Sequence, residues 1–160
     1  MLSFAMNRSN LFDVKAAKLM NLPPILLVED DKNDLLLMRH ALRDAEVQNS
    51  LLVAENGEVA IGFLTKQHKS GAPFDGILIT DINMPRVDGF QLLQWLQNQP
   101  PLKDITKLVM SSSLLEADLA RSLHFGAAAY FIKPSSYASL VDLVRQLKKT
   151  YFEATEPLPH

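Results

Sequence analysis

Residues 77–81 read Ile-Leu-Ile-Thr-Asp, an apolar run that ends abruptly in a carboxylate. A short, continuously apolar run is typical of a strand that is covered on both faces of a sheet. A helical pattern follows, and Pro100 and Pro101 stop it. Its apolar positions are Phe90, Leu92, Leu93 and Leu96. The segment therefore predicts a buried strand followed by a helix.

This unit of an apolar run and a helical pattern occurs five times along the chain. The other runs are Ile25 to Val28, Leu51 to Ala54, Leu108 to Met110 and Ala129 to Ile132. Buried strands that alternate with helices indicate a parallel sheet with helices on both faces. The sequence therefore predicts an α/β fold, a doubly wound five-stranded parallel sheet.

Length and composition favour one globular domain. The chain has 160 residues, 48% of them hydrophobic, which is enough for a substantial core and argues against disorder. We expect the folded domain over residues 24–151, an N-terminal extension over residues 1–23 with no role that the sequence assigns, and a short tail over residues 152–160.

The charge balance and the missing cysteines exclude several classes of function. Basic and acidic residues number 16 and 18, and this balance gives no support for a broadly basic surface that would bind nucleic acid or an acidic membrane, although it leaves room for local patches. The absence of cysteine excludes disulfides, thiolate zinc sites and cysteine nucleophiles. No apolar run approaches a membrane span, and we expect a cytoplasmic protein without nucleic-acid or membrane partners.

Polar residues follow four of the five predicted strands. They are Glu29 and Asp30 after the first, Asp81 and Asn83 after the third, Ser111 after the fourth and Lys133 after the fifth. In open α/β sheets, ligands bind beyond the carboxyl ends of the strands, where loops and helix N-termini converge. We therefore expect these residues to share one site.

The residue types at this edge suit a metal ion and a phosphoryl group. Glu29, Asp30 and Asp81 would repel one another unless a cation lay among them. Oxygen ligands with open positions favour Mg²⁺, which binds through carboxylates and phosphate oxygens. Lys133 and Ser111 can bind phosphate oxygens. Asp81, at the end of a buried strand, is then the candidate attacking carboxylate.

Each of these residues also has a purely structural interpretation. Aspartates after strands commonly cap the next helix, and this is the favoured interpretation for Asp31 or Asp34, as it is for Asp88. A Lys-Pro pair is commonly a solvated turn, three serines commonly cap a helix, and Tyr130 can simply pack at the sheet edge. Only the joint placement at four strand ends favours a site.

Four segments together resemble the receiver domain of two-component response regulators. They are Ile-Leu-Leu-Val-Glu29-Asp30, Thr80-Asp81-Ile-Asn83-Met-Pro85-x-x-Asp88-Gly89, Met110-Ser111-Ser112 and Gly126-Ala-Ala-Ala-Tyr130-Phe-Ile-Lys133-Pro134. The order and intervals agree over about residues 24–151. The resemblance implies a flavodoxin-like sheet with strand order 2-1-3-4-5.

The resemblance also implies a phosphoacceptor and its metal ligands. Asp81 resembles the residue that accepts a phosphoryl group from a histidine kinase. Asp30 and Asp81 resemble direct Mg²⁺ ligands, together with the main-chain carbonyl of Asn83. Glu29 resembles the acid that acts largely through metal-bound water.

Three further positions resemble the parts that respond to the phosphoryl group. Ser111 resembles the hydroxyl that moves toward it, Lys133 the residue that pairs with it, and Tyr130 the aromatic that turns inward. The Lys133–Pro134 bond is expected to be cis. The family more often has Thr at the Ser111 position, so we expect looser coupling to Tyr130.

The loops resemble the single-domain subgroup that is paired with bacterial phytochrome kinases. This implies a stand-alone response regulator whose partners are a histidine kinase, a second copy in a homodimer and an unknown downstream protein. Such a protein is not an enzyme beyond its own phosphorylation and dephosphorylation.

Two alternatives stay open. One is a Mg²⁺-dependent phosphohydrolase with an aspartyl nucleophile, but such enzymes place a second Asp where this chain has Asn83. The other is a scaffold that has lost the chemistry, which the presence of Asp30, Asp81, Ser111 and Lys133 disfavours.

Overall fold

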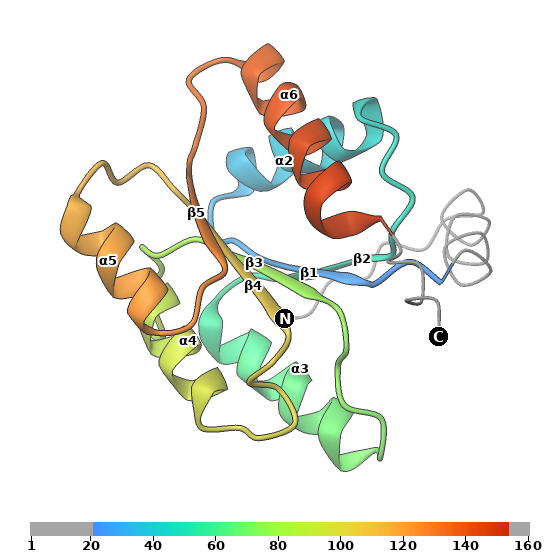
Figure 1. Cartoon of the computed structure of the whole chain (residues 1–160), viewed down its shortest axis with the longest axis vertical. Coiled ribbons are helices and arrows are strands. Elements are labelled where there is room, and N and C mark those ends of the chain that lie inside the picture. The colour runs from blue at the N-terminus through green and yellow to red at the C-terminus, as the bar shows by residue number, and fades with distance from the viewer. Residues whose placement is uncertain (1–20, 154–160) are drawn as a thin grey trace, which may run out of the picture.

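A computed structural model of the chain describes residues 21–153, so the predicted extension up to residue 20 and the end of the predicted tail lie outside it. Five strands form one parallel sheet in the order β2-β1-β3-β4-β5, with helices on both faces (Figure 1). The strands are β1 (Ile25–Val28), β2 (Leu51–Ala54), β3 (Ile77–Thr80), β4 (Thr106–Ser111) and β5 (Ala129–Ile132). The predicted doubly wound, flavodoxin-like fold is confirmed.

The helices divide into two layers. They are α2 (Lys32–Asp44), α3 (Gly57–Lys69), α4 (Gly89–Gln97), α5 (Glu116–His124) and α6 (Tyr137–Leu147), which continues into the short π-helix η1 (Lys148–Phe152). Residues of α2, α6 and η1 share one core with alternate residues of β1, β3 and β4. Residues of α3 and α4 share the core on the other face. This burial on both faces explains why the strands are continuously apolar.

The strand register aligns the ends of β1 and β3. Val28 lies beside Thr80, so Glu29 and Asp81 are the next residues on neighbouring strands. Ser111 lies beside Ile132 at the ends of β4 and β5, and Lys133 follows directly. The register therefore carries the predicted polar residues to one edge of the sheet.

Helix caps hold the loops at this edge. The Asp31 side chain accepts a hydrogen bond from the Asp34 N–H and caps α2. Asp88 and Gln91 form a reciprocal capping box at the start of α4. The predicted caps at Asp31 and Asp88 are confirmed. Across residues 21–153, no helix is long and apolar enough to cross a membrane.

Candidate functional site

Three acids meet at the carboxyl ends of β1 and β3. Oxygen atoms of Glu29, Asp30 and Asp81 all lie within 4.8 Å of one another. Glu29 and Asp81 are buried, whereas Asp30 is exposed. The donors are all carboxylate oxygens, which fit a hard divalent cation such as Mg²⁺. The predicted acidic cluster therefore exists as a geometric unit, with one side open to solvent.

The Asp81 carboxylate is held at both oxygens. Oδ1 accepts a hydrogen bond of 2.7 Å from the backbone N–H of Ile82, and Oδ2 accepts one of 2.9 Å from Lys133 Nζ. The backbone of Asp81 continues the sheet, since its N–H donates to the Val28 carbonyl. Two donors from different elements therefore fix the rotamer of this side chain.

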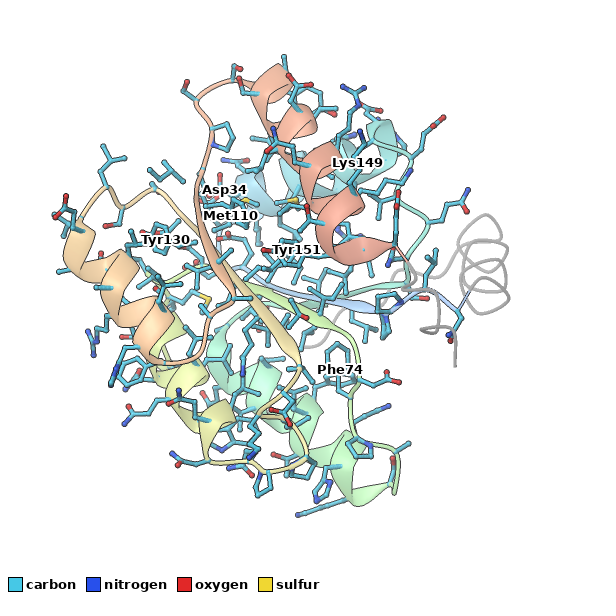
Figure 2. The ribbon with its side chains drawn as sticks, viewed as in Figure 1. Asp34, Phe74, Met110, Tyr130, Lys149 and Tyr151 are labelled. Carbon is cyan, nitrogen blue, oxygen red and sulfur yellow. The ribbon has the colours of Figure 1, made fainter. Side chains whose placement is uncertain are left out.

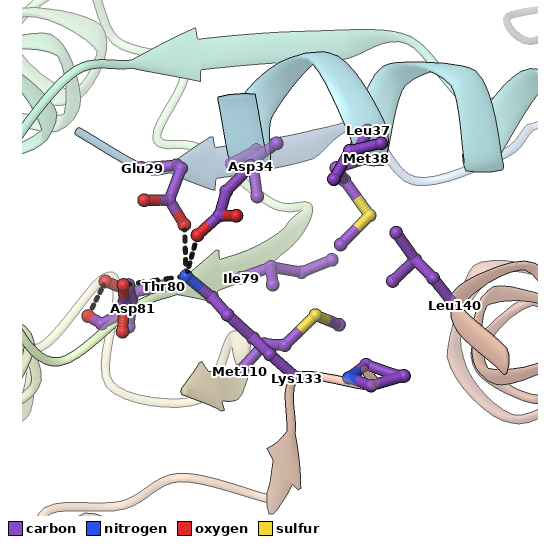
Figure 3. A pocket seen from close by; sticks show the side chains of 12 residues that line it. Glu29, Asp34, Leu37, Met38, Ile79, Thr80, Asp81, Met110, Lys133 and Leu140 are labelled. Carbon is purple, nitrogen blue, oxygen red and sulfur yellow. Dashed lines mark hydrogen bonds and ion pairs between the residues drawn. The ribbon is translucent and has the colours of Figure 1, made fainter. Parts of the chain in front are cut away.

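Lys133 reaches three acids at once (Figure 3). Its Nζ donates to Asp34 Oδ2 at 2.7 Å, to Asp81 Oδ2 at 2.9 Å and to Glu29 Oε2 at 3.0 Å. Burial disfavours the charged ammonium, but the hydrogen bonds to these carboxylates outweigh it and raise the pKa of Lys133 above its ordinary value. Lys133 is therefore a fixed cation in the site.

The electrostatics still favour a second cation. Lys133 pairs with three carboxylates, those of Glu29, Asp34 and Asp81, and a fourth carboxylate, that of Asp30, lies close to Glu29 and Asp81. Burial raises the pKa of Glu29, and hydrogen bonds from the Asp31 N–H and from Lys133 only partly oppose this. The negative charge is therefore incompletely compensated, and a bound divalent cation would relieve it.

The expected cis bond between Lys133 and Pro134 is wrong. Residues 21–153 contain no cis peptide bond. The trans bond is the more stable form before proline, and the long lysine side chain reaches the acids from it. The Lys133 N–H donates to the Ser111 carbonyl at 2.8 Å, which holds the start of the loop after β5 beside β4.

Ser111 and Tyr130 lie beside the acids rather than among them. Ser111 is buried at the end of β4, and its Oγ accepts a hydrogen bond from the Ser113 N–H. Tyr130 is a residue of β5, and Figure 2 shows it on the side of that strand that faces α5. Its hydroxyl donates to the Ser113 carbonyl at 2.8 Å. Both predicted residues thus contact Ser113, and this loop connects them.

Asn83 lies two residues beyond Asp81, on the exposed side of the same loop. Its main-chain carbonyl as a metal ligand stays a prediction, as do the ligand roles of Glu29, Asp30 and Asp81.

Asp34 is the site residue that the sequence interpretation missed. It lies in the first turn of α2, and its carboxylate bonds Lys133 instead of capping the helix. Asp34 and Lys133 also line a pocket whose apolar wall includes Leu37, Met110 and Leu140 (Figure 3). The available signal was an acid one helical turn after the Glu29-Asp30 pair, on a helix that starts at the site.

The sequence of this chain is similar to those of known response regulators. The profile of the response regulator receiver domain matches residues 25–145. Response regulator Rcp1 of Synechocystis sp. is 30% identical over 140 residues, which cover 86% of this chain and 95% of Rcp1. Two-component response regulator ARR9 of Arabidopsis thaliana is 28% identical over 141 residues, covering 79% of this chain and 59% of ARR9.

Solved structures give the same result. The Mn²⁺-bound form of Rcp1 has a TM-score of 0.73 at 29% identity, over 86% of this chain and 99% of that one. The phosphorylated cyanobacterial phytochrome response regulator RcpA has a TM-score of 0.72 at 27% identity, over 81% and 93%. Because the family profile spans most of the chain and Rcp1 aligns over nearly its whole length, the chain belongs to the response regulator receiver domain family of two-component signalling.

Proposed function

We propose that the chain is a stand-alone response regulator that accepts a phosphoryl group from a histidine kinase on Asp81. The observation that carries this proposal is the geometry of the Asp81 carboxylate. Hydrogen bonds from the Ile82 N–H and from Lys133 hold it beside Glu29 and Asp30, and the Asp30 side of this group is exposed to solvent. The proposed receiver unit is residues 24–151, and the proposed location is the cytoplasm.

The proposed reaction is a displacement at phosphorus. An Asp81 oxygen forms the new O–P bond, the P–N bond of the phosphohistidine breaks, and the imidazole keeps the electron pair. Lys133 lies on Asp81 Oδ2 and can neutralise charge on a phosphoryl oxygen as it arrives. In self-dephosphorylation a water oxygen forms the new bond to phosphorus, the Asp81 O–P bond breaks, and the Asp81 carboxylate and inorganic phosphate are released. Self-phosphorylation and self-dephosphorylation are the only reactions that we assign.

Mg²⁺ is the proposed cofactor. Glu29, Asp30 and Asp81 would hold it, with the carbonyl of Asn83 as a further ligand. When bound, it supplies positive charge to the phosphoryl oxygens. The Mn²⁺-bound form of Rcp1 supports a divalent cation in this family.

A phytochrome histidine kinase is the proposed phosphodonor. RcpA is a phytochrome response regulator, and its structure in the phosphorylated form is similar over most of both chains. These similarities support the same input for this chain.

The proposed output is a phosphorylation-dependent change in protein association, with a homodimer as the first partner and an unknown downstream protein as the second. Ser111, Ser113 and Tyr130 form a hydrogen-bonded series from the end of β4 to β5. Movement of the Ser111 hydroxyl toward a phosphoryl group would therefore disturb Tyr130 and the start of α5.

Labelling with a small phosphodonor tests the proposal. With acetyl phosphate and Mg²⁺, we expect one hydroxylamine-labile phosphoryl group per chain, and none without Mg²⁺. Asp81→Asn should take up no label. Asp88→Asn is the matched control, since it makes the same chemical change at a helix cap that asparagine also fills. Label that persists in Asp81→Asn would assign the phosphoacceptor elsewhere.

A further inference from the structure

Asp34 supplies Lys133 with a carboxylate that lies outside the acidic cluster. The ammonium has three protons, and the structure gives them three acceptors, Asp34, Asp81 and Glu29. Asp34 is the nearest of the three, at 2.7 Å. Its side chain is 41% exposed, whereas that of Lys133 is 18% exposed, so the pair lies at the mouth of the site.

Lys133 and a cation at the acidic cluster would share two carboxylates. Glu29 and Asp81 belong to the group of acids that can hold a metal ion, and both also accept hydrogen bonds from Lys133. Asp34 is not part of that group as the described residues define it. Among the described contacts, Lys133 is also the only hydrogen-bond donor to the Asp34 carboxylate. A cation that draws Glu29 and Asp81 toward itself therefore leaves Lys133 with Asp34.

We propose that Asp34 is a positioning residue that keeps Lys133 in the site while a divalent cation occupies Glu29, Asp30 and Asp81. This inference deepens the proposed function, because the cation is the proposed Mg²⁺ and Lys133 is the proposed phosphoryl partner. Asp34 and Glu29 approach the ammonium from the side of α2 and β1, and Asp81 approaches it from β3 (Figure 3). With Asp34 present, the Lys133 ammonium has a carboxylate of its own, and the divalent cation can take Glu29 and Asp81. Without Asp34, the ammonium and the divalent cation compete for the carboxylates of Glu29 and Asp81.

A double-mutant cycle on metal affinity tests this competition. Mg²⁺ alone is titrated calorimetrically into the full chain and into Asp34→Asn, Lys133→Gln and the double variant. Lys133→Gln removes a competing cation, so Mg²⁺ should bind more tightly. We expect this tightening to be at least about threefold larger in the Asp34→Asn background than in the parent, the size that directly contacting charges show. An equal or smaller factor would overturn the role of Asp34.

Asp31→Asn is the matched control. It removes one negative charge from the same turn of α2, while asparagine still caps the helix. The factor for Lys133→Gln should be the same in Asp31→Asn as in the parent. A factor as large as in Asp34→Asn would mean that any charge loss on α2 has this effect, which would overturn a specific role for Asp34.

Two single variants keep the test decisive if Lys133→Gln does not fold. Asp34→Asn should weaken Mg²⁺ at least about threefold more than Asp31→Asn does. In the Mg²⁺-saturated parent, the ¹⁵N signal of the Lys133 ammonium should stay protected from exchange with water, and Asp34→Asn should lose this protection. Equal Mg²⁺ affinities with unchanged protection would overturn the proposal.

These results are independent of phosphoryl labelling. Mg²⁺ coupling between Asp34 and Lys133 without label on Asp81 would overturn the proposed phosphoacceptor and keep this inference. Label on Asp81, together with effects of the Asp34 and Lys133 variants on Mg²⁺ affinity that simply add, would keep the proposed phosphoacceptor and overturn this inference. A parent chain that binds no Mg²⁺ would overturn both this inference and the proposed cofactor.

Discussion

At the scale of single residues, the site combines two buried carboxylates that pair with Lys133 and one exposed carboxylate that no described contact pairs with a cation. Glu29 and Asp81 are buried and bonded to Lys133. Asp30 is exposed, and within residues 21–153 its carboxylate joins the group of three acids. Asp30 therefore adds repulsion to the metal-free protein and a ligand to the metal-bound one.

Asp30→Ala separates these two effects. We expect Mg²⁺ affinity to fall at least about tenfold, the scale on which changes around metal sites act. Thermal stability without metal should stay level or rise, because one like charge is removed. Titration calorimetry and thermal unfolding without metal measure the two quantities.

Asp31→Ala is the opposite control for Asp30→Ala. Asp31 caps α2, and loss of such a cap costs about 0.5 to 2 kcal/mol. Its Mg²⁺ affinity should change much less than that of Asp30→Ala. A large loss of metal-free stability in Asp30→Ala would show that Asp30 is a structural residue instead.

The sequence predicts most of this site because parallel strands end at one edge. Glu29, Asp81 and Lys133 each follow a strand directly, so their place in the chain determines their place in space. Asp34 is different. An acid in the first turn is favourable at almost any helix N-terminus, so its residue type does not reveal that its side chain turns toward Lys133.

At the scale of elements, the start of α4 is packed directly against the Asp81 loop. A Cβ atom on Gly89 would lie 2.2 Å from the Asp81 carbonyl oxygen and 2.8 Å from the Ile82 Cα. The Gly89 N–H donates to the Ile82 carbonyl at 2.8 Å. Backbone atoms cannot swing aside as a side chain can, so glycine here sets how closely the helix approaches the site.

Gly89→Ala should therefore reduce both stability and the uptake of label at Asp81. We expect a loss of about 1 to 3 kcal/mol in the free energy of unfolding, the usual cost of forced overpacking. Chemical denaturation and acetyl phosphate labelling measure the two effects. The close contact with Asp81 links them, since relief of the clash must move the Asp81 loop or α4.

Gly62→Ala is the matched control for Gly89→Ala. Gly62 lies inside α3, and a Cβ there would meet nothing within 4 Å. Alanine should raise stability by about 0.5 to 1 kcal/mol through its better helix propensity. Equal effects of the two substitutions would contradict the close packing of α4 on the site.

The sequence predicts elements well where burial alone determines them. The limits of β1, β2, β3 and β5 follow the apolar runs, and β1 and β3 are buried along their whole length in the middle of the sheet. β4 is longer than its apolar run, from Thr106 to Ser111. Lys107 obscures its start, because this lysine is buried and its Nζ donates to the Lys103 carbonyl. The partner is a backbone carbonyl only four residues earlier, and a side-chain-to-backbone bond of this kind leaves no trace in the pattern of apolar residues.

At the scale of the whole molecule, one surface carries exposed apolar side chains and is connected to the site by hydrogen bonds. We call the surface of α5, β5 and α6 the output face. Its exposed apolar side chains are Leu115, Leu119, Leu123, Ile132 and Tyr137. Leu119 and Leu123 lie four residues apart and form an apolar stripe on α5, and Leu115 is the N-cap residue that precedes this helix. Apolar stripes of this kind are typical of protein interfaces.

Hydrogen bonds connect the output face to the end of β4. The Ser113 N–H donates to Ser111 Oγ, and the Ser113 hydroxyl donates to Asp118 in the first turn of α5. The Tyr130 hydroxyl donates to the Ser113 carbonyl. A shift of Ser111 would therefore change the contacts that hold the start of α5 and the ring of Tyr130.

Phosphorylation should strengthen self-association through the output face. A phosphoryl group shifts an equilibrium only by its differential affinity for the two states, and allosteric couplings commonly change affinity about 5- to 150-fold. Sedimentation velocity over a wide concentration series, with and without beryllofluoride and Mg²⁺, should show a change in this range. Tyr130→Ala should reduce the response by removing the bond to Ser113.

Two leucine variants locate the interface. Leu119→Ser should weaken association in the beryllofluoride state, because Leu119 is an exposed leucine of the α5 stripe. Leu36→Ser is the matched control, since Leu36 is also an exposed leucine on a helix but lies on α2. Equal weakening by both would mean that the copies do not meet through the output face. The same association constant with and without beryllofluoride would exclude a phosphorylation-driven homodimer, because a switch that does not change self-affinity can act only through a different partner.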